Sequence, residues 1–202
     1  QSKIDRSIEM VREAIRKGIR FDYLLVDSWF TCADLLNFIC SRHLKCHLIG
    51  MIKMGKTWYK TRFGNLNASG IIERLKKEKS VKYSRKLNCH YAYIDAEYVN
   101  RKIRIFFCKR GRKGTWNAFL STNIGLDFFE AYRIYSMRWA IEVCFSEMKG
   151  LLKLGKCQCR NFSSQIASVS LTMMQYNILS FIKRFEAYET IGGLFNQTVN
   201  GT

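Results

Sequence analysis

The amino-acid sequence predicts an α/β (α+β) fold, in which helices pack on a sheet and further helices end the chain. Residues 21–26 (FDYLLV) are a nearly continuous apolar run, which is typical of a strand buried on both faces of an α/β sheet. Residues 90–99 and 102–108 have the composition of two paired strands, joined near Asn100. Residues 164–184 are apolar almost all round, which favours a helix that packs against the sheet or a partner chain.

The composition bounds the class of protein. The 202 residues are 48% hydrophobic, enough for one sizeable core plus an insertion. Lys and Arg number 34 against 16 Asp and Glu, so the formal net charge is +18. Such a chain favours a polyanionic partner, with nucleic acid first and an anionic membrane surface second. The sequence has no run of about 18 apolar residues and no signal-peptide pattern. We therefore predict that the protein does not span a membrane and that it is located in the cytoplasm.

The first elements follow from their apolar spacing. A helix is predicted at residues 6–17, where Asp5 or Ser7 can cap the start and a glycine follows the end. The strand of residues 21–26 comes next. A second helix is then predicted at about residues 31–43, before a core strand in CHLIGMI, the heptapeptide that ends at Ile52.

Asp27 directly follows the strand of residues 21–26. Ligands and chemistry collect just beyond the carboxyl ends of strands in α/β sheets, so Asp27 is a candidate metal ligand. The alternative is that this carboxylate only caps the following helix.

Residues 53–116 differ in character, because Lys, Gly and Tyr dominate, and they predict a β-rich insertion. Its best candidate for DNA contact is the basic loop KRGRKG at residues 109–114, followed by Trp116. Aromatic rings beside cations can stack on a base while the cations neutralise phosphates. An ordinary strand aromatic with a solvated rim is the alternative for Trp116. The DNA-binding candidates in this segment are Lys109, Arg110, Arg112, Lys113 and Trp116.

A charged stripe is predicted in the next segment. After a strand in residues 117–125, Asp127 with Glu130 resembles a capping box that starts the stripe's helix or a short helix before it. On one α-helix, four side chains would fall within an arc of roughly 60°, beside an apolar arc that we expect to be buried. A carboxylate there can hold a hard cation while cations and a phenol hold phosphate oxygens, which suggests phosphodiester cleavage. The alternative is a weak surface ion pair between the stripe's arginine and glutamate. The four residues are Tyr135, Arg138, Glu142 and Lys149.

The eight cysteines are scattered through strand-like and helix-like runs without a secretory context. We predict that most are small, reduced core residues. Cys157 and Cys159 lack the C-x2-C spacing of a structural zinc site, so zinc is not the favoured reading there.

The sequence pattern Y-x2-R-x3-E-x6-K in residues 135–149 resembles the signature of DDE transposases of bacterial insertion sequences, specifically the insertion-sequence-four group. LLVDSWF at residues 24–30 is similar to that family's segment around its second catalytic aspartate. NAFLSTNIG at residues 117–125 is similar to its last strand before the glutamate helix. The resemblance covers most of residues 6–185.

This resemblance implies a ribonuclease H-like core and two divalent ions, Mg²⁺ or Mn²⁺, for cleaving and joining DNA. Asp27 and Glu142 would hold the metal, while Tyr135, Arg138 and Lys149 would fix DNA phosphates. The partners implied are transposon-end and target DNA, bound by a homodimer in the bacterial nucleoid. The division expected is a first core part at residues 1–52, the insertion at 53–116, a second core part at 117–185 and a tail at 186–202.

The family also needs a first catalytic aspartate on an earlier strand. Two more strands and a helix must separate it from Asp27, which takes at least roughly 35 residues. Only 26 residues precede Asp27, and Asp5 starts a helix instead of lying on a strand. We therefore expect a partial core that lacks the first strands and is inactive alone. Two alternatives stay open, a DNA-binding transposase remnant and a ribonuclease H-like nuclease without strand transfer.

Overall fold

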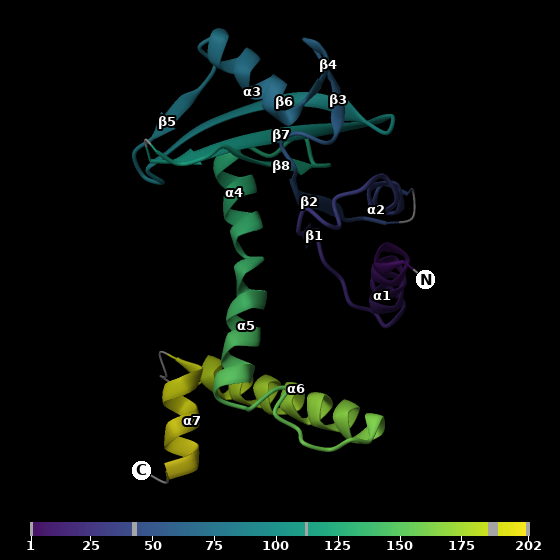
Figure 1. Ribbon diagram of the computed structural model, residues 1–202, viewed down its shortest axis with the longest axis vertical. Helices are drawn as coiled ribbons and strands as arrows, with labels where there is room; N and C mark the ends of the chain where they lie inside the picture. Colours follow the sequence, from purple (N-terminus) through teal and green to yellow (C-terminus); the bar gives the residue numbers. More distant parts are fainter. Residues whose placement is uncertain (1, 42–43, 112, 186–189, 201–202) are drawn as a thin grey trace. The chain divides into compact units, whose positions relative to one another are not determined.

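The computed structural model describes residues 2–41, 44–111, 113–185 and 190–200 (Figure 1). The chain forms two compact units, residues 1–137 and 138–202. The first unit contains the sheet and the second is helical, so the predicted mixed α/β (α+β) class is confirmed.

Eight strands of the first unit form one sheet with the order β1-β2-β8-β7-β6-β3-β4, and β5 pairs with β6. The β1–β2 pair is parallel and the other pairs are antiparallel. The strands are β1 (Tyr23–Val26), β2 (His47–Ile52), β3 (Trp58–Thr61), β4 (Gly64–Asn67), β5 (Lys82–Ser84), β6 (Cys89–Tyr98), β7 (Arg101–Arg110) and β8 (Asn117–Ser121).

Helix α1 (Lys3–Arg16) begins earlier than predicted, and its cap differs from both predicted caps. Ser2 is the N-cap, and its side chain accepts a hydrogen bond from the Asp5 amide. The Asp5 carboxylate in turn accepts from the Ser2 amide, which completes a capping box. These hydrogen bonds hold the pKa of Asp5 below its usual value.

Strand β1 is the terminal strand of the sheet order and is half-buried along its length. As expected, β1 packs on both faces, with Leu24 and Val26 against one apolar cluster and Tyr23 and Leu25 against the other. Because it pairs on one side only, with β2, its residues are half-buried and not fully buried. Helix α2 (Ala33–Ile39) follows and is shorter than the predicted span, of which residues 42–43 lie outside the described part.

Two apolar clusters cover opposite faces of the sheet, as Figure 1 shows for α3 (Ala68–Lys77) and α4 (Phe128–Ser136). Alternation along β7 produces this division. Ile103 and Ile105 point into the cluster that includes α2 and α3, whereas Phe106 points into the cluster beneath α4. Both faces of β7 are therefore buried near its centre.

The predicted hairpin of the insertion is confirmed. Strands β6 and β7 pair over ten positions, from Cys89 opposite Arg110 to Tyr98 opposite Arg101. Val99 and Asn100 join them, both with positive φ, as in the two-residue turns that match the twist of paired strands.

The second unit consists of α5 (Trp139–Gly150), α6 (Phe162–Phe185) and α7 (Ile191–Asn200). Its small core joins Leu179 of α6 to Ile191 and Leu194 of α7, so a helix occupies the described part of the expected tail. Among the described residues, no helix has the length and apolar character needed to cross a bilayer.

Candidate catalytic site and basic rim

Asp27 lies immediately beyond β1, and its side chain is exposed. A tight turn fixes its backbone, because the Phe30 amide donates to the Asp27 carbonyl at 2.9 Å and the Thr31 hydroxyl donates to the same oxygen at 3.3 Å. One carboxylate oxygen accepts from the Ser28 amide. Helix α2 starts later, with Cys32 as its N-cap, so the alternative role of Asp27 as that helix's cap is wrong.

Gly50 of β2 allows this turn to lie against the sheet. It is opposite Val26 in the parallel pair. A Cβ at this position would overlap the Thr31 hydroxyl and lie 2.8 Å from Cγ2 of Val26. The absence of a side chain at Gly50 therefore sets where the turn that carries Asp27 can pack.

Tyr135 reaches the same strand end from α4. Its hydroxyl donates to the Val26 carbonyl at 3.3 Å. Its ring stacks on Phe119 of β8, with 5.4 Å between centroids and planes 6° apart. The fold thus brings together Asp27 and Tyr135, which are 108 positions apart in the sequence.

The strand ends beside Asp27 carry cations. Strands β1 and β2 are parallel, so Lys53 beyond β2 lies on the same side as Asp27. The antiparallel partner β8 begins there and its neighbour β7 ends there, because Ile52 is opposite Ala118 and Cys108 is opposite Asn117. At a strand spacing of about 4.8 Å, β7 lies three strands from β1, about 14 Å across the sheet. We call this row of strand ends the basic rim, marked by Asp27, Lys53, Trp116 and Lys109.

The predicted basic loop lies on the rim. Arg110 and Lys113 are exposed and Lys109 is half-buried, whereas Arg112 lies outside the described residues. A Cβ at Gly114 would overlap the Arg110 carbonyl, so this glycine permits the tight loop. Trp116 is half-buried against the apolar cluster that includes α2 and α3, and the Lys76 ammonium lies 5.7 Å from its ring centroid.

Some rim residues were not predicted. Trp29, 73% exposed, holds the Lys53 ammonium 4.8 Å from its ring centroid. Lys53 could have been found by the argument used for Asp27, because it directly follows a strand that is parallel to β1.

The rim continues into a groove of about 940 Å³ between the β5–β6 turn and α4. The turn contributes the exposed Arg85 and Lys86, and it adjoins the basic loop through a hydrogen bond from the Gly111 amide to the Asn88 carbonyl. Helix α4 contributes one cation, Arg133, and the carboxylates of Glu130 and of its N-cap Asp127. The groove is lined by Ser84, Arg85, Lys86, Leu87, Asp127, Phe129, Glu130, Tyr132, Arg133 and Ser136.

The glutamate lies in the second unit. The prediction that all four stripe residues share one helix is wrong, because the helix is interrupted after Ser136, leaving Tyr135 on α4. Arg138 is the N-cap of α5, and its Nη1 lies 2.7 Å from Oε1 of Glu142. The other carboxylate oxygen of Glu142 is buried and has no hydrogen-bond partner within the described part of the chain. Lys149 is exposed.

The apolar side of α5 also differs from the prediction. Ile141 and Phe145 are 52% and 43% exposed. The contacts of α5 with α6 instead involve Met148, which is buried, and Glu147, which accepts a hydrogen bond from the Tyr176 hydroxyl at 2.7 Å. Burial and the Glu147 carboxylate raise the pKa of Tyr176.

The donor chemistry fits a hard divalent ion. Such ions prefer carboxylate oxygens, and both an exposed carboxylate after β1 and an unpartnered oxygen on Glu142 are present. No group of three or more His, Cys, Asp or Glu side chains suited to a metal occurs among the described residues.

Comparisons with known proteins identify the family. Residues 4–178 match the model of the transposase DDE domain, whereas no curated protein matches. The fold is similar to a piggyBac transposase, solved by cryo-EM as a synaptic complex with hairpin DNA, with a TM-score of 0.55 and 12% identity. The match covers 98% of this chain and 39% of that one, so this chain spans about two fifths of its length. The expected ribonuclease H-like fold is confirmed. The chain therefore belongs to the transposase DDE domain family.

Proposed function

We propose that this chain is catalytic-domain sequence of a DNA transposase that cleaves and joins transposon-end DNA with the aid of two divalent ions. The observation that carries the proposal is the contact of Tyr135 with the β1 carbonyl next to Asp27, on a rim of cations. A signature residue thus contacts the backbone one residue before a strand-end carboxylate that is distant in sequence, on a surface that would attract phosphates.

In this proposal Asp27 and Glu142 hold Mg²⁺ or Mn²⁺. Bound metal would stabilise negative charge on the attacking and leaving oxygens of an in-line displacement. The ion pair with Arg138 orients one oxygen of Glu142 and leaves the other for a ligand. Lys149 and Tyr135 would hold phosphate oxygens beside the scissile bond.

The DNA would lie along the basic rim. Lys109, Arg110, Arg112 and Lys113 would neutralise phosphates, with Trp116 beside them, and the net charge of +18 supports this binding. The similar piggyBac transposase was solved with hairpin DNA in a synaptic complex, which supports DNA as the partner here. We extend the proposal to transposon ends and target DNA, to a homodimer on paired ends, to the insertion-sequence-four group and to the bacterial nucleoid.

We further propose that these 202 residues do not cleave DNA by themselves. The family chemistry uses three carboxylates, and only Asp27 and Glu142 are assigned among these residues. The division into core parts at 1–52 and 117–185, an insertion at 53–116 and a tail from 186 belongs to the same proposal.

The test compares these 202 residues with the longest open reading frame that contains them. Both are incubated with Mg²⁺ and labelled DNA that carries the element's ends, and nicking and joining are measured. We expect both activities from the long frame, with each reduced at least about 10³-fold by Asp27→Asn or Glu142→Gln. Glu147→Gln is the matched control, because Glu147 lies on the same helix and bonds to Tyr176.

Each contrary result changes one part of the proposal. Nicking by the 202 residues that Glu142→Gln abolishes would contradict the inactivity of the shorter chain. If the protein encoded by the long reading frame nicks DNA without joining it, a nuclease is favoured. DNA binding without either activity would favour a remnant that has lost catalysis.

A further inference from the structure

The segment between α5 and α6 holds two cysteines side by side. Cys157 and Cys159 are both free thiols, the first half-buried and the second exposed. One residue separates them, and their side chains are near enough for each to influence the pKa of the other. Neither is buried in the core.

Helix α6 holds this segment in place. The Gln165 side-chain amide donates to the carbonyl oxygens of both Cys157 and Cys159, the first at 3.3 Å. Its backbone amide bonds to the Asn161 carbonyl, within the first turn of α6. Two carbonyls fixed by one side chain restrict the backbone that carries the thiols, so the two sulfurs stay near each other.

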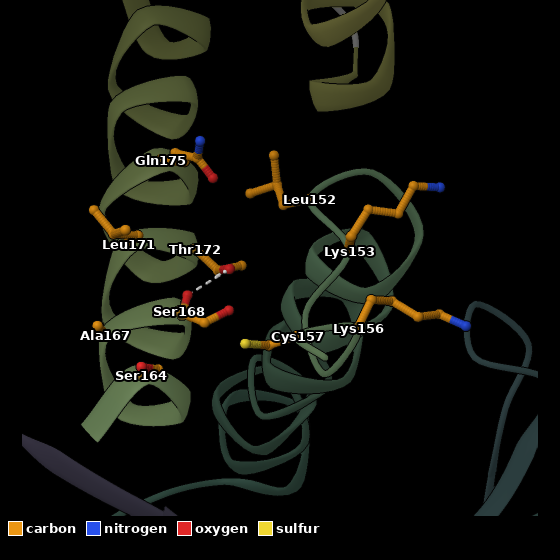
Figure 2. A pocket seen from close by; sticks show the side chains of 10 residues that line it. All are labelled: Leu152, Lys153, Lys156, Cys157, Ser164, Ala167, Ser168, Leu171, Thr172 and Gln175. Atoms are coloured by element: carbon orange, nitrogen blue, oxygen red, sulfur yellow. Dashed lines mark hydrogen bonds between the residues drawn. The ribbon is translucent and has the colours of Figure 1, made fainter. Parts of the chain in front are cut away.

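The Cys157 thiol faces a cavity of about 510 Å³ between this segment and α6 (Figure 2). The helix side of the cavity carries hydroxyl groups one turn apart, on Ser164, Ser168 and Thr172. Ser168 lines the cavity with Cys157 and lowers the pKa of that thiol. The cavity is therefore an open, polar approach to the Cys157 sulfur.

The hydrogen bonds act differently on the two thiols. The Cys159 amide, the Cys159 thiol and the Ser168 hydroxyl lower the pKa of Cys157. The neighbouring Cys157 raises the pKa of Cys159. Burial, with a smaller contribution from Cys89, raises the pKa of Cys108 to about 11, and burial also raises the pKa of Cys89. Cys157 therefore forms thiolate, the reactive form of cysteine, more readily than Cys89 and Cys108 do.

We propose that Cys157 and Cys159 are a modification site, a dithiol that a hydroperoxide oxidises reversibly to an intrachain disulfide. The Cys157 thiolate attacks one peroxide oxygen, the O–O bond breaks, and the departing hydroxide leaves as water after taking a proton. The Cys159 sulfur then attacks the sulfenic acid on Cys157, so the S–S bond forms as the S–O bond breaks. The oxygen departs as a second water with the Cys159 proton. Two electrons pass from the sulfurs to the peroxide.

The sequence provides a direct readout. Trypsin cleaves after Lys156 and Arg160, which releases the peptide of residues 157–160 with both cysteines and no other. The 202-residue protein is treated with an equivalent of hydrogen peroxide at pH 7, blocked with iodoacetamide and digested. We expect the peptide in a form two hydrogens lighter than the dithiol, and the alkylated dithiol after treatment with dithiothreitol.

Two variants and one control thiol separate the roles. Cys159→Ser should leave a sulfenic acid on Cys157 that dimedone traps, whereas Cys157→Ser should leave Cys159 largely unreacted. Cys157 should react with iodoacetamide at least about tenfold faster than Cys108, whose pKa is about 11. Ser168→Ala should slow that reaction, because it removes one donor to the Cys157 sulfur.

The proposal is overturned if peroxide leaves the 157–160 peptide as two free thiols. It is equally overturned if Cys157 reacts no faster than Cys108, or if the disulfides formed join separate chains. None of these results depends on cleavage of DNA, so this inference and the proposed function fail separately.

Discussion

Replacing Gly50 by alanine tests how the turn that carries Asp27 is positioned. The added methyl group would overlap the Thr31 hydroxyl and lie 2.8 Å from Cγ2 of Val26, whereas real Cβ atoms essentially never approach within 3.0 Å. Val26 belongs to a hydrogen-bonded strand, so most of the shift must come from the turn. The Thr31 hydroxyl donates to the Asp27 carbonyl, and its displacement would move the backbone of the proposed metal ligand.

Overpacking of this kind costs about 1–3 kcal/mol of the free energy of unfolding. For a chain of this size that corresponds to about 2–4 °C in Tm for each kcal/mol. Urea unfolding followed by circular dichroism measures the loss. Gly55→Ala is the matched control, because nothing lies within 4 Å of a Cβ there, and we expect a change within about 0.5 kcal/mol.

A double-mutant cycle attributes the cost to the turn. Thr31→Ala removes the hydroxyl that the new methyl group would meet, so Gly50→Ala should cost at least about 1 kcal/mol less in that background. The reasoning is refuted if Gly50→Ala costs the same in both backgrounds. A loss no larger than that of Gly55→Ala would refute it as well.

Three further predictions concern other features. Tyr135→Phe should lower the free energy of unfolding in urea by about 0.5–1.5 kcal/mol, because it removes a hydrogen bond to the β1 backbone and keeps the ring. An unchanged free energy of unfolding would argue against this hydrogen bond. Lys109→Ala should lower the salt slope of duplex DNA binding by about 1, whereas Arg20→Ala, at the amino end of β1, should not; equal effects would argue against the rim. Ser2→Ala should destabilise α1 above pH 3.8 and progressively less below it, as measured by circular dichroism. The reason is that the Asp5 carboxylate, whose pKa is lowered in the fold, stabilises the fold only while it is ionised. A loss of stability that does not change with pH would contradict this.

Two kinds of sequence feature gave predictions that the structure confirms: the residue at which an apolar strand ends, and the residues of a tight turn between two strands. Asp27 was placed correctly because an apolar run that stops at a carboxylate has few interpretations in an α/β sheet. The turn at Asn100 was found because two strand patterns left only two residues between them. Both signals are local, and tertiary packing did not override them.

The errors came from long-range context. The half-burial of β1 was missed because an apolar run does not tell whether a strand has neighbours on both sides. The interruption before Arg138 carries no proline or glycine, so nothing local indicated that Tyr135 and Glu142 lie on different helices. Lys53 was missed because its importance depends on the pairing of β2 with β1, which periodicity alone does not reveal.

The basic loop has one more consequence, for how such a protein can change. Its two ends are fixed by the pairing of Cys108 with Asn117, the last rung between β7 and β8. Residues added to or removed from the loop therefore leave the register of the sheet, and with it Asp27, where they are. The surface proposed to meet DNA can diversify in length and charge while the proposed chemistry keeps its geometry, so loops exchanged between relatives should transfer DNA preference without rebuilding the core.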